Sequence, residues 1–246
     1  DELCAMGREL LDRQPMTNAE LRRALAELMP GRDRAALQFS VHYLVPVVQV
    51  PPAGLWGAHG QMPATTAETW LSAPMATSAA PHRLILRYLA AFGPAAVADM
   101  QAWSGLTRLR EVVDELRPEL VCFGDESGRE LFDVPDAPLP GPDGPAPVRF
   151  LPEYDNLMVA YKDRRRMLAD AHCPLVFAGN AAVRATVLVD GFVAGTWKAA
   201  VRDGCAQLSV EPFGRMSRAD RAAVTQEGLR LLTFVFPGAQ NTKVDF

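Results

Sequence analysis

A proline- and glycine-rich segment, PDAPLPGPDGPAP at residues 135–147, constrains the fold of this chain more than any other feature. Proline fixes φ and lacks a backbone donor, so neither a helix nor a central strand can run through such a segment. We therefore expect a linker over residues 136–147. Helical patterns precede it and strand patterns follow it, which predicts an α+β protein.

Residues 1–75 carry the pattern of a winged helix. Helices are predicted at 2–13, 17–28 and 33–43, and strands at 44–50 and 65–71 on either side of a glycine-containing turn. Thr17 with Glu20 three residues later is a capping-box signature at the second helix. Three helices followed by a two-stranded hairpin is the order of a winged helix-turn-helix unit.

Residues 76–135 repeat this order and predict a second winged helix. Helices are expected at 81–92, 95–103 and 107–116, and Thr107 is expected to cap the third. A compact hairpin at 120–133 would form the wing. The chain therefore contains a degenerate internal repeat, with two tandem winged helix-turn-helix units before the linker.

Residues 148–246 predict a small β-rich, barrel-like domain that ends in a helix. Strands are expected at 148–151, 182–189, 192–200 and 206–210, and an amphipathic helix at 217–232. Asp190-Gly191 is a favoured two-residue turn between the second and third of these strands. A partly closed barrel with one helix packed on it would satisfy the pattern.

Charge and hydropathy narrow the function classes. The formal net charge of −4 argues against a chain that coats nucleic acid indiscriminately, although it permits local basic patches. The longest apolar runs are interrupted by Arg87 and Arg184 and fall short of the roughly 20 residues that a membrane span needs. We expect a cytoplasmic protein without a membrane partner. The 4 cysteines show no Cys-x-x-Cys spacing, so they predict no zinc site.

The densest basic cluster is Lys162-Asp163-Arg164-Arg165-Arg166. Guanidinium groups donate in a fork that suits phosphate oxygens, so Lys162, Arg164, Arg165 and Arg166 are candidate phosphate contacts. The alternative is a solvated loop in which Asp163 pairs with its own neighbours.

Two further arginines, Arg108 and Arg110, begin the helix that would read DNA in the second winged helix. Three acidic residues on the same helix, Glu111, Asp114 and Glu115, argue against a role in the major groove. Among the tryptophans, Trp56 in the first wing is the candidate for DNA contact. Trp103 and Trp197 are expected to pack in the core.

Two other groups of potentially functional residues are better explained by structural roles. Glu153 and Asp155 could pair an acid with a base on one face of an extended segment. An Asp155 side chain that bonds the backbone is the interpretation we favour. His172, Cys173 and Cys205 lack the paired spacing of a metal site, so no metal is expected.

Four segments resemble one known family: VQVPPAGLWG at 48–57, RYLAAFGPAAVADMQAWSGL at 87–106, LPEYDNLMVAYKDRRR at 151–166 and VLVDGFVAGTWK at 187–198. In order and spacing they resemble the tandem winged-helix family that includes the AlkZ and YcaQ DNA glycosylases. The resemblance covers nearly the whole chain. It implies three winged helices followed by a β-barrel, a monomer without metal or organic cofactor, and binding to double-stranded DNA with alkylated or crosslinked bases.

The resemblance also implies a catalytic Gln-x-Gln or Gln-x-Asp motif in the first winged helix. Neither motif occurs here, since Gln38 is followed by Phe39-Ser40 and Gln49 by Val50-Pro51. With two winged helices found, we expect the middle and C-terminal part of such a protein, inactive by itself, and we assign no catalytic residue.

The first wing departs from the family pattern as well. Ala53 and Gln61 stand where relatives commonly carry basic residues, and each missing cation removes a phosphate contact. The leading hypothesis is the DNA-binding portion of a glycosylase. The alternatives are a non-catalytic winged-helix DNA-binding or regulatory protein and an interaction scaffold without a nucleic-acid role.

Overall fold

The computed structural model describes residues 1–55, 58, 60–76, 81–141, 143–179 and 182–246. Trp56, a predicted DNA contact, lies outside the described residues. The chain divides into two compact units, Asp1–Ala79 and Ala80–Phe246, which are described separately below.

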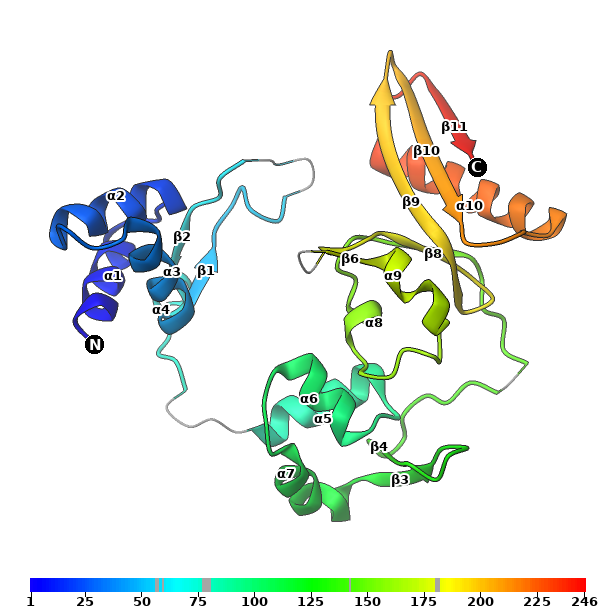
Figure 1. The fold of residues 1–246 in the computed structure, drawn as a ribbon, viewed down its shortest axis with the longest axis horizontal. Coiled ribbons are helices and arrows are strands. Elements are labelled where there is room, and N and C mark those ends of the chain that lie inside the picture. The colour runs from blue at the N-terminus through cyan, green and yellow to red at the C-terminus, as the bar shows by residue number, and fades with distance from the viewer. Residues whose placement is uncertain (56–57, 59, 77–80, 142, 180–181) are drawn as a thin grey trace. The chain divides into compact units, whose positions relative to one another are not determined.

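The first unit begins with three helices and a short hairpin (Figure 1). These elements in order are α1 (Glu2–Arg13), α2 (Asn18–Leu28), α3 (Arg34–Leu44), β1 (Val47–Gln49) and β2 (Ala64–Thr66). The capping box at α2 is confirmed: the Glu20 carboxylate accepts from the Thr17 backbone N–H at 2.8 Å. Leu11, Leu21 and Val41 are fully buried where the helices meet.

The predicted strand over 65–71 is wrong beyond Thr66, because residues 67–71 form helix α4 (Ala67–Leu71). The Thr66 hydroxyl accepts from the Thr69 backbone N–H and caps this helix. Both threonine hydroxyls also donate to the Asp12 carboxylate, and these bonds lower the pKa of Asp12. A side-chain cap therefore overrides the strand preference of consecutive threonines.

The second unit opens with three helices and a hairpin, as predicted. They are α5 (Pro81–Phe92), α6 (Val97–Ser104), α7 (Leu109–Leu116), β3 (Val121–Gly124) and β4 (Glu130–Asp133), with a 3-10 turn at Arg117–Glu119. The prediction that Thr107 caps α7 is wrong. Arg108 occupies the cap position with φ 61°, and the Gln101 side-chain oxygen accepts from the Leu109 N–H at 3.1 Å.

A five-stranded sheet follows, in the order β11-β10-β9-β8-β5. Its strands are β5 (Arg149–Leu151), β8 (Thr186–Val189), β9 (Phe192–Arg202), β10 (Cys205–Pro212) and β11 (Asn241–Asp245). Over the described residues β5 and β11 are unpaired edges, so the predicted barrel is not closed. The β8–β9 turn at Asp190-Gly191 is confirmed, with positive φ at both residues. Parallel pairing of β11 with β10 was not predicted.

Helix α10 (Arg218–Val235) lies along one face of this sheet (Figure 1). Its Val224 and Leu232 are fully buried against Leu208 of β10 and the neighbouring strands. Gly228 permits the close approach, since a Cβ there would lie 2.9 Å from the Val244 side chain. None of the helices in the described ranges is long and apolar enough to cross a membrane.

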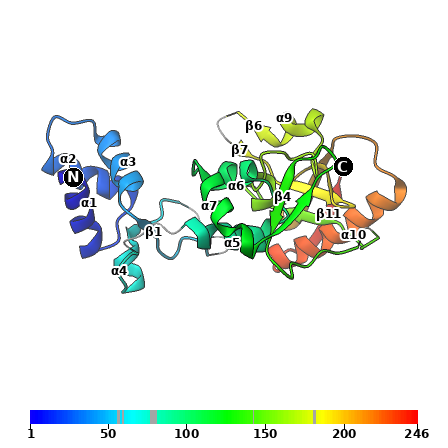
Figure 2. The same ribbon diagram turned by 90° about the horizontal axis from the view of Figure 1, so that it is seen from below.

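The predicted strand at 182–189 is two strands in different sheets. β7 (Ala182–Val183) pairs with β6 (Phe177–Ala178), whereas β8 belongs to the five-stranded sheet. Two short helices, α8 (Asn156–Val159) and α9 (Cys173–Val176), and a 3-10 turn at Asp170–His172 fill the chain between β5 and β6. Figure 2 shows α9 and β6 beside each other in this unit.

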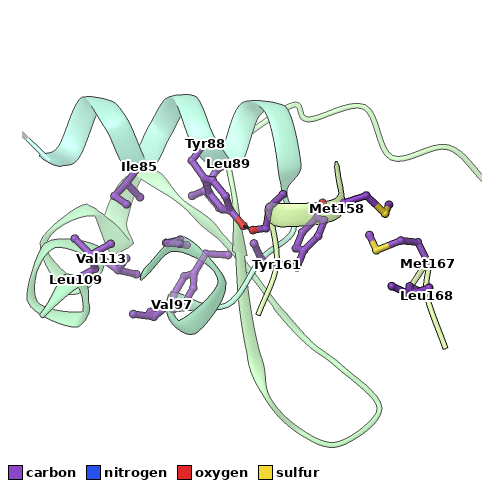
Figure 3. Packing of buried hydrophobic residues seen from close by; sticks show 14 of the residues in the cluster. Ile85, Tyr88, Leu89, Val97, Leu109, Val113, Met158, Tyr161, Met167 and Leu168 are labelled. Carbon is purple, nitrogen blue, oxygen red and sulfur yellow. Dashed lines mark hydrogen bonds between the residues drawn. The ribbon is translucent and has the colours of Figure 1, made fainter. Parts of the chain in front are cut away.

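One hydrophobic core joins the helices α5–α7 to the segments after the proline-rich stretch (Figure 3). The Tyr88 hydroxyl donates to the Ala160 carbonyl at 2.7 Å, and the Tyr161 hydroxyl donates to the Phe92 carbonyl at 2.7 Å. Burial raises the pKa of both hydroxyls. These reciprocal bonds satisfy two buried donors, so they fix α5 against the segment that follows α8.

Replacing Leu208 by alanine tests the packing of α10 on the sheet. Leu208 is fully buried, so Leu208→Ala is expected to lower the free energy of unfolding by about 2–5 kcal/mol. Leu139→Ala is the matched control, because Leu139 is 54% exposed and should change stability by less than about 0.5 kcal/mol. Urea unfolding followed by tryptophan fluorescence measures both. Equal effects would contradict the packing described.

Asp133 at the end of β4 is a buried carboxyl with few hydrogen-bond donors to offset its loss of solvation. It is 1% exposed; its Oδ1 accepts from the Val134 N–H at 2.8 Å, and its Oδ2 has no partner in the described part of the chain. Burial therefore raises the pKa of this carboxyl above its ordinary value. Gly93 is required beside it, since a Cβ there would lie 2.1 Å from Oδ1.

The raised pKa of Asp133 gives a pH dependence with a definite sign. Between the ordinary pKa of an aspartate and the raised pKa of Asp133, the folded state binds more protons than the unfolded state. The stability that protonated Asp133 retains at low pH is therefore lost as pH rises through its folded pKa. Asp133→Asn removes the buried charge. The free energy of unfolding of Asp133→Asn minus that of wild type should therefore increase from pH 3.5 to pH 7, as measured by urea unfolding. A difference that stays constant across that range would show that Asp133 titrates alike in both states.

Candidate nucleic-acid interface

Residues 162–166, here called the basic loop, are anchored by a carboxylate from α6. Asp99 is 1% exposed, and its Oδ1 accepts from the backbone N–H of Lys162 at 2.9 Å and of Asp163 at 3.4 Å. Its Oδ2 accepts from the Ala96 N–H at 2.9 Å. Charged acceptors make stronger hydrogen bonds than neutral ones, so Asp99 fixes the course of the loop.

Arg164 turns into the protein instead of toward solvent. Its Nε donates to the Met158 carbonyl at 2.8 Å, and its guanidinium lies 4.4 Å from the centroid of the Phe177 ring. Both contacts tie the loop to α8 and β6. The guanidinium of Arg164 therefore serves packing between elements in this structure.

Lys162, Arg165 and Arg166 are exposed on the same loop. Arg165 forms an ion pair with Asp163 at 2.7 Å, and this guanidinium holds the pKa of the Asp163 carboxyl well below its usual range. Arg166 donates to the Pro94 carbonyl at 3.1 Å and lies 4.1 Å from the centroid of the Tyr161 ring. The Lys162 ammonium has no ion pair or hydrogen bond within the described ranges.

The turn of the β3–β4 hairpin adds Arg129 to this region. Its guanidinium lies 2.9 Å from Asp125 and 3.4 Å from Asp163. Hydrogen bonds from the Ser127 hydroxyl and the Arg129 backbone lower the pKa of Asp125 to about 2. The sequence analysis missed Arg129, although a cation directly after Gly128 in a predicted wing was a usable signal.

A cleft of about 390 Å³ lies between the hairpin turn and the basic loop. It is lined by Asp125, Glu126, Ser127, Arg129, Leu131, Asp163, Arg165 and Arg166. Three cations and three carboxylates therefore face it. A phosphate that binds Arg129 or Arg165 would have to draw that cation away from its carboxylate. Arg166 in the lining and Lys162 on the same loop have no carboxylate partner in the described chain, so they can bind an anion without that exchange.

Arg108 and Arg110, the two arginines predicted to contact DNA from α7, pair with acidic residues instead of facing the cleft. Arg108 forms an ion pair with Glu111 at 2.9 Å, and Arg110 forms one with Glu130 at 3.2 Å. Arg117 joins the same Glu130 carboxylate at 2.7 Å. These cations are exposed, but each has an acidic partner, and no hydrogen bond or ion pair in the described chain joins Arg108 or Arg110 to the basic loop.

Other candidates have structural roles. The Asp155 carboxylate accepts from the Leu157 N–H at 2.9 Å and caps α8, which confirms the interpretation favoured from sequence. Tyr154 between Glu153 and Asp155 has φ 57°, so the two carboxylates do not lie on one extended face. Trp103 packs on Tyr88 at 5.2 Å, and Trp197 donates to the Leu151 carbonyl at 2.9 Å.

Comparisons with known proteins agree with this fold. A structure of Streptomyces sahachiroi DNA glycosylase AlkZ matches 100% of this chain and 69% of that chain, with a TM-score of 0.71 and 19% sequence identity. No curated protein matches in sequence. The family described as DNA glycosylase AlkZ-like matches residues 1–234. The resemblance predicted from sequence is confirmed, and this chain belongs to the AlkZ-like DNA glycosylase family.

Proposed function

We propose that this chain is the DNA-binding portion of an AlkZ-like DNA glycosylase that removes alkylated or crosslinked bases from double-stranded DNA. The observation that carries the proposal is the basic loop: the buried carboxylate of Asp99 fixes its backbone, and three cations point outward from it. A rigid backbone lowers the entropic cost of placing those cations on phosphates. The family match supports DNA as the partner.

Two winged helices are part of this proposal. In the first unit the helices α1–α3 lead into β1 and β2, and in the second unit the helices α5–α7 lead into β3 and β4. Gly105, with φ 71°, makes the short turn between α6 and α7. Helix, helix, helix and hairpin is the order in which winged helices present a recognition helix and a wing to DNA.

No catalytic residue is assigned to this chain. Its sequence contains neither Gln-x-Gln nor Gln-x-Asp, and of the two carboxylates that the sequence suggested for acid–base chemistry, Asp155 caps α8. The second candidate function, a non-catalytic winged-helix DNA-binding protein, is favoured by the same absence. Incubation with alkylated duplex DNA separates the two: release of a free base by this chain would exclude the non-catalytic protein.

Salt-dependent DNA binding tests the basic loop. Lys162→Ala with Arg166→Ala removes the two exposed loop cations that have no carboxylate partner in the described chain, and should reduce the slope of log affinity against log salt by about 2, because each lost phosphate contact releases about one counterion less. Fluorescence anisotropy with a labelled duplex over a series of salt concentrations measures this slope. Arg164 is left intact because it packs inside the unit.

The matched control changes the same charge elsewhere in the same unit. Arg215 and Arg218 are exposed and form no ion pair in the described chain, so Arg215→Ala with Arg218→Ala should leave the slope unchanged. If both double variants reduce the slope equally, net charge and not the basic loop determines binding, and the proposal fails.

A further inference from the structure

Helices α2 and α3 of the first unit enclose a basic groove that no sequence motif indicated. It has a volume of about 330 Å³ and is lined by Ala19, Arg22, Arg23, Ala26, Glu27 and Arg34, a set called the arginine groove below. The two helices lie side by side in both ribbon views (Figures 1 and 2). Three guanidinium groups and one carboxylate therefore line the groove.

Arg22 is held in place by a buried amide. Gln38 of α3 is 2% exposed, and its side-chain oxygen accepts from Arg22 at 3.2 Å. The Gln38 amide nitrogen lies 3.0 Å from His42 Nδ1, which fixes the orientation of the amide. Gln38 therefore holds the Arg22 side chain through its amide oxygen while His42 holds its amide nitrogen. Part of the entropy loss on ordering Arg22 has then already occurred in the free protein.

Arg23 and Arg34 have no hydrogen bond or ion pair from their side chains in the described chain. Glu27 lies four residues after Arg23 on α2, yet no ion pair joins them. The Glu20 carboxylate nearby is engaged by Thr17, whose bonds keep the pKa of Glu20 below its ordinary value, with a smaller contribution from Arg23. Two guanidinium groups thus face the groove with their donors unused.

The N-terminal end of α3 lies at one end of the groove. Arg34 is the first residue of this eleven-residue helix, and the Asp33 side chain caps it by accepting from the Ala36 N–H at 2.7 Å. The Asp33 carboxylate offsets the positive end of the helix dipole, so the positive charge at this end of the groove comes from the Arg34 guanidinium. Ala19 and Ala26 are small, so an anion can approach the guanidinium groups without displacing a large side chain.

We propose that the arginine groove is a phosphate-binding site that holds a phosphodiester of the nucleic-acid backbone. Each guanidinium presents two parallel N–H donors that match two phosphate oxygens, whereas a lysine ammonium offers no such fork. The inference rests on the proposed function for the identity of its ligand. It adds a contact on the first unit, separate from the basic loop of the second.

The test measures duplex binding by Arg23→Ala with Arg34→Ala in the whole 246-residue chain. Arg22 is left intact because of its bond to Gln38. The expected result is a decrease of about 2 in the salt slope and weaker binding at every salt concentration. The control Arg215→Ala with Arg218→Ala should bind as wild type. A conservative pair, Arg23→Lys with Arg34→Lys, should keep most of the slope, which shows that charge and not folding was changed.

The other outcomes separate the inference from the proposed function. If wild type and Arg23→Ala with Arg34→Ala bind duplex alike while the basic-loop variant binds less well, the groove inference is overturned and the proposed function stands. If wild type binds no duplex even at low salt, both the proposed function and the phosphodiester ligand are overturned. Titration with inorganic phosphate, followed by the NMR signals of the arginine side chains, then tells whether the groove takes free phosphate instead.

Discussion

The carboxylate of Asp99 is the interaction on which the arrangement of the second unit depends. It lies on α6, before the proline-rich stretch, and accepts backbone N–H groups of Lys162 and Asp163, which come after it. A buried carboxylate is costly unless donors surround it, and the three backbone N–H groups reduce that cost. The hydrogen bonds of this one carboxylate thereby fix α6 against the basic loop and set the direction in which the loop turns its cations.

Local signals predicted most of the helices, and non-local pairing accounts for the failures. Thr17 with Glu20 and Ser217 with Asp220 are caps that act within three residues, so the starts of α2 and α10 are visible in the sequence. Strand β11 has no such signal: it is short and largely exposed, and it exists because it pairs in parallel with β10. The β-rich part of the prediction holds, but the sheet is not closed into a barrel, since closure depends on pairing between edges that no local pattern specifies.

In the candidate site, too, local sequence signals located the residues, while contacts with other elements decided what each residue does. Composition alone located the cluster at 162–166, but it could not show that Arg164 packs on Phe177 while Lys162 stays free. That difference is set by residues on other elements.

The arginine groove was not predicted because its members come from two helices separated by a turn. Nothing in the sequence distinguishes the buried Gln38 that positions Arg22 from an ordinary exposed polar residue.

The pairing of individual cations explains how an acidic chain can bind DNA. The 25 lysines and arginines are outnumbered by 29 carboxylates, and several, such as Arg110, Arg117 and Arg165, are held by an acidic partner. Moving such a cation to a phosphate breaks one charge-assisted bond to make another, so the net gain is small. A cation without a carboxylate partner makes its phosphate contact without that loss. Affinity should therefore depend on the unpaired cations of the two proposed sites, Lys162 and Arg166 in the basic loop and Arg23 and Arg34 in the arginine groove, and not on the net charge of −4.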